Sequence, residues 1–256
     1  MNVEALARTL ADARERGVQA RPAWPNPAPS LADAYAVQHA ANAIYMDTRA
    51  GWKCGATNEG AQKAQGLDGP FIGPMPRRDV RGDGTTVMFT ETIGAVEPEI
   101  AFRLARDLSG EVSEEEAADA VDACHLALEV IGRRVVGPGT SGGFDKGLGL
   151  VMDFAGNAVF VVGPAVADWR GQDWTGVPVE GMRDGAVVER GSTGNVMGNP
   201  LASLAWAAKR LAQDGETLRS GDWVSTGTCT AAIQAAHGVA VSARFGDLGE
   251  VSVRFG

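Results

Sequence analysis

Cysteine and histidine are scarce in this sequence, with three of each among 256 residues. The cysteines form no C-x-x-C pair and are too few for a disulfide framework, which is typical of a reducing compartment. We interpret them as small buried hydrophobic residues. A zinc site built on several histidines would have to draw all three from distant segments, so the composition argues against zinc.

Basic stripes and long apolar runs are also lacking. The formal net charge is −9, from 23 Lys and Arg against 32 Asp and Glu, and this balance argues against nucleic acid or an anionic membrane as a partner. No run approaches the length that spans a bilayer, and the first residues show no basic segment followed by an apolar one. We therefore expect a cytoplasmic protein.

The length and the hydrophobic fraction of 45% suit one large domain or two small ones. Helical patterns dominate residues 1–80, whereas short β-branched runs separated by Gly and Asp dominate residues 81–256. We expect an N-terminal helical part and a β-rich catalytic part that form one continuous domain.

Apolar residues at helical spacing predict helices over 3–16, 31–50, 59–66 and 201–212. Ser113 and Glu116 form a capping box that opens a further helix, reaching about residue 124. Asp184-Gly185 predicts a hairpin turn. Segments 69–76 and 137–147 are expected to be loops, the first of them a rigid one that lines a pocket or acts as a lid. Strands are expected at 51–55, 87–89, 95–104, around Glu129, and at 158–162, 177–183, 186–189, 239–245 and 250–255.

Three carboxylates stand in apolar surroundings, two in Val96-Glu97-Pro98-Glu99-Ile100 and one in Leu128-Glu129-Val130. If the first segment is a strand, Glu97 and Glu99 project from the same face. A half-buried pair of anions must take up a proton or hold a cation. Three carboxylates without a nearby Cys or His pair favour Mg²⁺ or Mn²⁺ over zinc.

A purely structural interpretation stays open at this point. Glu99 could lie at a sheet edge, which Pro98 would fit, and Glu129 could be an exposed helix residue. Lys53 either snorkels from a semi-buried strand, which the sequence favours, or sits in a pocket where desolvation lowers its pKa toward values useful for acid–base chemistry. The turn at 226–230 offers N–H groups and hydroxyls that can hold a carboxylate, or it is simply a tight turn.

Several motifs run in one order from about residue 30 to the end of the chain. They are Ala34-Tyr35-Ala36-Val37-Gln38, Gly51-Trp52-Lys53-Cys54-Gly55, Glu97-Pro98-Glu99-Ile100-Ala101-Phe102, Leu128-Glu129-Val130, Gly198-Asn199-Pro200-Leu201, Leu218-Arg219-Ser220-Gly221-Asp222, Thr226-Gly227-Thr228-Cys229-Thr230 and Phe245-Gly246-Asp247-Leu248-Gly249-Glu250-Val251-Ser252-Val253. In this order the motifs resemble the bacterial 2-hydroxypenta-2,4-dienoate (2-keto-4-pentenoate) hydratase family. That family belongs, with the 4-oxalocrotonate decarboxylases, to the fumarylacetoacetate hydrolase superfamily.

The resemblance implies an α+β fold, with a mixed, rolled β-sheet core, an N-terminal helical part and assembly into a homo-oligomer. It implies that the three carboxylates named above hold Mg²⁺ or Mn²⁺ and that Lys53 is the acid–base group beside them. It also implies that Thr230, with Thr228 as a second candidate, contacts the carboxylate of a 2-keto acid substrate of the kind met in aromatic catabolism.

Two departures from the family's pattern bear on the substrate. The lid motif Pro-Asp-Phe-Gly of the hydratases reads Pro70-Phe71-Ile72-Gly73 here, so Phe71 faces the substrate where a polar group is expected. The hydratases place paired serines after Asp-Asn-Ala, whereas this chain reads Asp153-Phe154-Ala155-Gly156-Asn157. Asn157 is the candidate substitute as a hydrogen-bond donor to substrate.

The first expectation for the reaction is hydration of a 2-hydroxypenta-2,4-dienoate-type acid to a 4-hydroxy-2-keto acid. The alternatives, in order, are a 4-oxalocrotonate-type decarboxylase, an acylpyruvate C–C hydrolase and a non-catalytic partner of a related enzyme. Hydrolysis ranks lower because it usually needs a His–Glu pair, and His125 does not stand in the hydrolase motif. The last alternative stays open because hydratases and decarboxylases of this family can associate.

Overall fold

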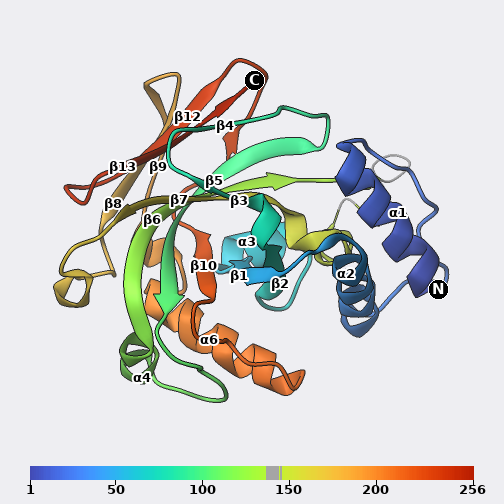
Figure 1. The fold of residues 1–256 in the computed structure, drawn as a ribbon, viewed down its shortest axis with the longest axis horizontal. Helices are drawn as coiled ribbons and strands as arrows, with labels where there is room; N and C mark the ends of the chain where they lie inside the picture. Colours follow the sequence, from blue (N-terminus) through green and yellow to red (C-terminus); the bar gives the residue numbers. More distant parts are fainter. Residues whose placement is uncertain (137–143, 145) are drawn as a thin grey trace.

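The structure is a computed structural model that describes residues 1–136, 144 and 146–256. Figure 1 shows its elements in chain order. The helices are α1 (Val3–Arg16), α2 (Leu31–Tyr45), α3 (Glu59–Gln65), α4 (Glu114–Asp119), α5 (Gly147–Met152) and α6 (Pro200–Gln213). The strands are β1 (Arg49–Gly55), β2 (Phe71–Pro76), β3 (Val80–Gly82), β4 (Thr85–Val87), β5 (Ile93–Leu104), β6 (Val121–Gly132), β7 (Asn157–Ala165), β8 (Pro178–Arg183), β9 (Ala186–Ser192), β10 (Trp223–Thr228), β11 (Ile233–Gln234), β12 (Ala240–Phe245) and β13 (Glu250–Phe255).

The larger sheet is mixed and rolled. Its strands run in the order β2-β1-β10-β5-β6-β7-β3, with β11 paired to β5. The β1–β10 and β3–β7 pairs are parallel, and the other pairs are antiparallel. The two outer strands, β2 and β3, are separated by only the short turn Arg77–Asp79. A turn of three residues can span only a short distance. The two edges of the sheet must therefore lie close together, and the sheet curls around an interior.

The rolled interior is filled at one level by a small apolar cluster of Met75, Ala101, Ala127 and Phe160. The odd-numbered positions of β5 and β6 face this interior, because side chains alternate along a strand. Their even-numbered neighbours, including Ile100 and Leu128, belong to the main core on the outer side of the sheet. Inward-facing polar groups of several strands can therefore meet in this interior.

The second sheet has the order β4-β13-β12-β8-β9 and packs against the outer side of the first through β13, which contacts β6 and β7. Gly163 on β7 permits this close approach, since a Cβ there would lie 2.7 Å from the Cβ of Val251. The β8–β9 hairpin turns at Asp184 and Gly185, both with positive φ, as the sequence predicts. Figure 1 shows this sheet on the side of the molecule away from α1 and α2.

The helices have local signals at their ends. Asn2 caps α1, which ends at Gly17 in the left-handed region. Ser30 and Asp33 form a capping box at the start of α2, and Asn199 caps α6. Helices α1 and α2 pack against each other at the right of Figure 1, and α6 packs beside β10. Among the described residues, no helix is long and apolar enough to cross a membrane.

The expected fold class, a mixed rolled sheet with a helical N-terminal part, is confirmed. The boundary between residues 80 and 81 stays a prediction, although β1 and β2 of the first part join the larger sheet. Most of the loop expected at 137–147 lies outside the described residues.

Several element bounds were wrong. The second helix stops at Tyr45 rather than at residue 50, because the buried strand β1 begins at Arg49. The helix after Ser113 stops at Asp119 because β6 begins at Val121. Residues 71–76 are strand β2, not a loop. This strand lies at the edge of the sheet, where proline is tolerated because one side of the strand makes no ladder hydrogen bonds.

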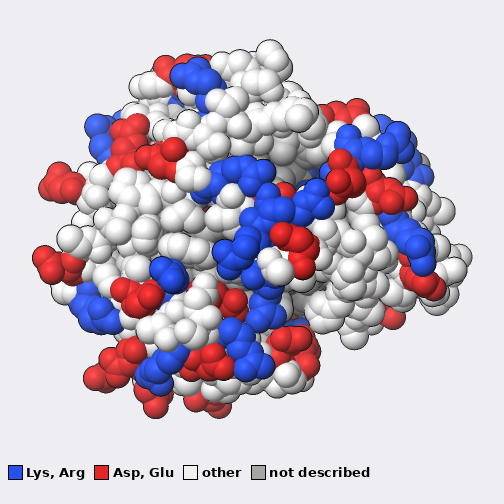
Figure 2. Space-filling view, viewed as in Figure 1, with Lys and Arg blue, Asp and Glu red and all other residues white. Residues whose placement is uncertain are grey.

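Charges of both signs share the face drawn in Figure 2. Lysine and arginine gather near its middle, with aspartate and glutamate beside them. Oppositely charged surface side chains pair in the described part of the chain, for example Arg78 with Glu15 at 3.0 Å and Arg219 with Asp107 at 3.0 Å. Basic and acidic side chains are therefore mixed on this face, and it carries no unbroken basic surface.

Candidate active site

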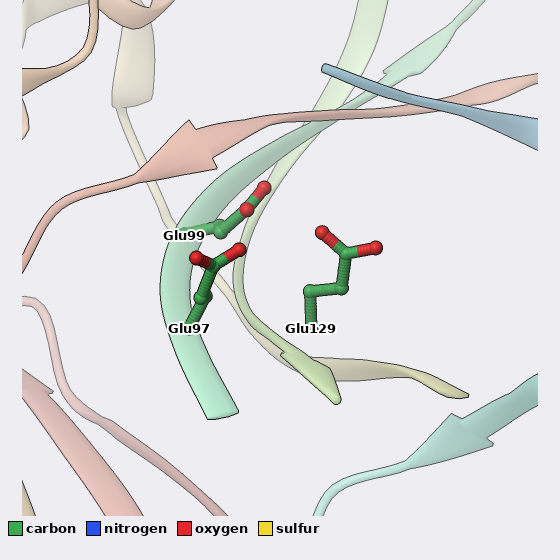
Figure 3. A group of neighbouring side chains, drawn as sticks. All are labelled: Glu97, Glu99 and Glu129. Carbon is green, nitrogen blue, oxygen red and sulfur yellow. The ribbon is translucent and has the colours of Figure 1, made fainter. Parts of the chain in front are cut away.

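The three carboxylates meet inside the rolled sheet. Glu97 on β5 is the direct cross-strand partner of Glu129 on β6, and Glu99 follows two residues later on the same face. One oxygen from each lies within 4.8 Å of one from each of the others. Figure 3 shows Glu97 and Glu99 rising from one strand and Glu129 facing them from the next.

Burial excludes the structural alternatives for these residues. Strand β5 lies between β10 and β6, so Glu99 is not at a sheet edge, and Glu129 is on a strand rather than on an exposed helix. Glu99 and Glu129 are both 0% exposed, and Glu97 is half-buried. Burial of three like charges has a high energetic cost unless a cation or protons compensate them.

Lys53 supplies one compensating charge. Its side chain projects from β1, is 2% exposed, and places Nζ 2.9 Å from Oε2 of Glu129. The ammonium also donates to the carbonyl oxygen of Ala155 at 3.0 Å. The snorkelling interpretation is thus wrong, because the charged end of the side chain is buried with its stem.

The pKa values follow from burial and from these charges. Burial raises the pKa of Glu97 to about 7, with Lys53 opposing and Glu129 reinforcing the rise. Burial and the neighbouring carboxylates also raise the pKa of Glu99. For Lys53, burial acts to lower the pKa, but the attraction of Glu129, Glu97 and Glu99 together outweighs it, so the pKa is raised. The lowered pKa considered from the sequence does not occur in the site without a cation.

A divalent cation fits the residues present. With all groups ionised, three carboxylates and one ammonium leave two negative charges to be balanced. Oε1 of Glu99 is buried without a hydrogen-bond partner among the described residues, and Oε2 of Glu129 has only its ion pair with Lys53. Buried oxygens of this kind normally have a partner, and a set of carboxylate oxygens is the one that Mg²⁺, Mn²⁺ and Ca²⁺ prefer.

Two neighbouring groups hold Glu99 in place. Ser225 on β10 donates its hydroxyl to Oε2, and the backbone N–H of Gly227 donates to the same oxygen at 2.9 Å. Gly227 has a φ of +116°, and a Cβ there would lie 2.1 Å from Oγ1 of Thr57. Ser225 was not among the residues expected from the sequence to form the site, although it lies only two residues before Gly227 on the same strand.

A cavity of about 440 Å³ lies beside the carboxylates. Lys53, Glu97, Phe71 and Thr228 line it, as does Thr57, which the sequence analysis did not select. The Thr57 hydroxyl is buried and has no hydrogen-bond partner among the described residues. Thr57 lines the same cavity as Lys53 and Glu97, and its free hydrogen-bonding capacity makes it a candidate contact for a polar ligand.

The predicted substrate contacts fall in different places. The Phe71 ring lines the cavity with its centre 5.3 Å from Nζ of Lys53. Thr228 lines it too, while Thr230 lines an adjoining hollow that shares Glu97 and Thr228. Asn157 is fully buried behind Glu129 and is not among the cavity-lining residues, so its predicted contact with substrate finds no support in its position.

No histidine is among the described residues that line this cavity. His125 is on β6, but its Nδ1 lies 2.9 Å from the carbonyl oxygen of Gly163 and its ring packs edge-on against Trp223 at 5.0 Å. The fold and the site thus define an α+β protein whose polar centre consists of three carboxylates and a lysine and fits a divalent cation.

This class is matched by a known family. The profile of the fumarylacetoacetate (FAA) hydrolase C-terminal family matches residues 55–256. A 2-keto-4-pentenoate hydratase of Burkholderia vietnamiensis is 32% identical over 226 residues, which are 87% of this chain and 85% of the relative. The chain belongs to the fumarylacetoacetate hydrolase C-terminal family, and the resemblance found in its motifs is confirmed.

A decarboxylase is similar to the chain as well. A 4-oxalocrotonate decarboxylase of Pseudomonas putida is 31% identical over 207 residues, 80% of this chain and 76% of the relative. The solved structure of 4-oxalocrotonate decarboxylase from Pseudomonas putida G7, complexed with magnesium and adipate, has a TM-score of 0.87 at 27% identity. The match covers 99% of this chain and 97% of that one.

Proposed function

We propose that this protein is a divalent-metal-dependent hydro-lyase that hydrates a 2-hydroxypenta-2,4-dienoate-type acid to a 4-hydroxy-2-keto acid. The observation that carries the proposal is the convergence of Glu97, Glu99 and Glu129 within 4.8 Å, with Lys53 in contact with Glu129. The assignment to the hydratases is supported by relatives of that name at about 30% identity over most of the chain.

The three carboxylates would hold the cation, which the proposal specifies as Mg²⁺ or Mn²⁺. Support for a divalent ion comes from the decarboxylase structure solved with magnesium and again with calcium. When bound, such an ion polarises the C2 oxygen of a chelating 2-keto acid and stabilises negative charge on it.

The chain's own residues account for binding and proton transfer. Lys53 has three N–H donors, and two of them have partners in Glu129 and in the carbonyl oxygen of Ala155. The ammonium is therefore fixed at the cavity wall, where it can give a proton to the substrate, and the neutral amine that remains can take one back. Thr228 and Thr230 would bind the substrate carboxylate, and Phe71 forms an apolar wall that excludes water from one side.

A 4-oxalocrotonate-type decarboxylase is the second candidate, because the decarboxylase structure matches almost the entire chain. Acylpyruvate hydrolysis ranks below both, since no histidine is among the described residues of the cavity wall. A non-catalytic partner ranks last, because such a chain has no need of a buried lysine among three acids.

Product analysis tests this order. The purified chain is incubated with Mg²⁺ or Mn²⁺ and, in parallel, with 2-hydroxypenta-2,4-dienoate, 4-oxalocrotonate and an acylpyruvate. We expect a 4-hydroxy-2-keto acid from the first, with no product in EDTA and with a rate about 10²–10⁴-fold lower for Lys53→Met. Release of CO₂ from 4-oxalocrotonate alone would replace hydration by decarboxylation, and inactivity toward all three acids would overturn the proposal of an enzyme of this class.

We also propose a homo-oligomer in the cytoplasm that acts in aromatic catabolism. Light scattering after size exclusion measures the assembly, and the same experiment with an added decarboxylase relative tests whether the chain associates with a related enzyme. A monomer at all concentrations would contradict the first of these proposals.

A further inference from the structure

The N-terminal helix reaches the carboxylate centre through a chain of buried hydrogen bonds. Nδ2 of Asn157 donates to Oε1 of Glu129 at 3.1 Å. Oδ1 of Asn157 accepts from Arg14 of α1 at 3.0 Å. The same guanidinium is paired with Asp79 at 2.7 Å, and all four side chains are mostly or fully buried. Arg14 lies outside residues 55–256, the part of the chain that the family profile matches.

The guanidinium determines which way the Asn157 amide points. An arginine has only donors, so the end of the amide that faces it must be the oxygen. The NH₂ end must then face Glu129, which accepts as an ionised carboxylate. Arg14 itself is held by Asp79 and by the rings of Tyr45 and Phe154, whose centres lie 4.6 and 4.5 Å from its central carbon.

The consequence concerns the two oxygens of Glu129. Asn157 engages Oε1, so Oε2, which contacts Lys53, is the oxygen left without a hydrogen-bond partner among the described residues. A carboxylate with one oxygen fixed by the protein has one preferred orientation toward a cation. Residues that hydrogen-bond to metal ligands orient them in this way, and the loss of such a residue typically weakens metal affinity about 10–100-fold.

We propose that Asn157 is a positioning residue for Glu129, and that Arg14 fixes the orientation of the Asn157 amide from helix α1. The proposal rests on the metal-dependent function proposed above. It assigns Asn157 to the ligand rather than to the substrate. It also makes α1 part of the metal centre rather than a peripheral cover.

Binding of Mn²⁺ to the metal-free chain, measured by calorimetry, tests this proposal without turnover. Asn157→Leu keeps the branching of the side chain at Cγ but removes both hydrogen bonds, and we expect Mn²⁺ affinity to fall about 10–100-fold. Arg14→Met should weaken binding in the same direction, and Arg14→Lys, which keeps a donor, should restore most of it. Arg8→Met is the matched control, because Arg8 is on the same helix but exposed, in a surface pair with Glu4.

The double variant shows whether Arg14 affects metal binding through Asn157 or independently of it. If Arg14 acts through Asn157, Arg14→Met with Asn157→Leu binds Mn²⁺ no more weakly than Asn157→Leu alone. Affinity of Asn157→Leu equal to that of the parent chain would overturn the positioning role, and losses that multiply would overturn the part of Arg14. Circular dichroism checks the fold, and Asn157→Leu with Arg14→Lys keeps the test if Arg14→Met does not fold. Failure of the parent chain itself to bind Mn²⁺ would instead refute the proposed function.

Discussion

Glu97→Gln should stabilise the protein without a cation and abolish its response to Mg²⁺. Burial raises the pKa of Glu97 from 4.5 to about 7, and at about 1.36 kcal/mol per pH unit this difference corresponds to ~3 kcal/mol. Glu97 is only half-buried, so solvent screening reduces the expected gain to ~1–2 kcal/mol. The neutral amide avoids this cost because it has no charge to desolvate.

The sign of the pH dependence follows from the raised pKa. Below about pH 4.5 the Glu97 carboxyl is protonated in both folded and unfolded chains, so the two proteins should differ little there. As the pH rises from 4.5 to about 7, ionisation favours the unfolded parent chain and the gap should open; above that pKa it should stay constant. Denaturant unfolding in EDTA at pH 5 and pH 8 measures it.

Adding Mg²⁺ should reverse the order of stability. A ligand at one hundred times its Kd stabilises the folded state by about 2.7 kcal/mol, which exceeds the gain expected for Glu97→Gln. The parent chain should therefore become the more stable of the two, and the variant should stay unchanged. The reasoning is refuted if the folded variant keeps stoichiometric Mg²⁺, or if it is less stable than the parent chain in EDTA at pH 8.

Three further substitutions have distinct expected results. Lys53→Met removes the positive charge beside the carboxylates, so Mn²⁺ should bind at least as tightly while kcat falls about 10²–10⁴-fold, and weaker binding would contradict this assignment. Ser225→Ala removes one of the two hydrogen bonds to Oε2 of Glu99 and should weaken Mn²⁺ affinity about 10-fold in calorimetry, whereas unchanged affinity would show that the Gly227 N–H suffices. Thr57→Val removes the buried hydroxyl that has no partner among the described residues and should raise KM with metal affinity unchanged. Thr57→Ser should keep the parent KM, and equal KM values for all three chains would exclude a substrate contact.

Local sequence signals predicted most elements because their causes are local. The caps at Ser30 and Ser113 and the turn at Asp184-Gly185 act within four residues, and each was found where expected. Where the predicted secondary structure was wrong, the actual structure depended on a partner strand far away in the sequence. Residues 71–76 contain proline and glycine and look like a loop, but pairing with β1 makes them an edge strand.

For the site, the spacing Glu97-x-Glu99 was enough to place two carboxylates on one face of a strand. The sequence could not place Ser225 beside Glu99, because that contact depends on β10 lying next to β5, 126 positions away in the chain. Nor could it show that Asn157 contacts Glu129 rather than the cavity, since the amide's direction depends on Arg14 in another helix.

The amino-acid sequence by itself determined the family, the inward face shared by Glu97 and Glu99, and the kind of ion that such oxygens select. These depend on residue type and short spacing, which the chain carries in any conformation. Only the tertiary structure decided that Lys53 is buried against Glu129, that its pKa is raised rather than lowered, and that α1 takes part in the site. Those properties depend on distances and burial, which exist only once the sheet has rolled and brought remote segments into contact.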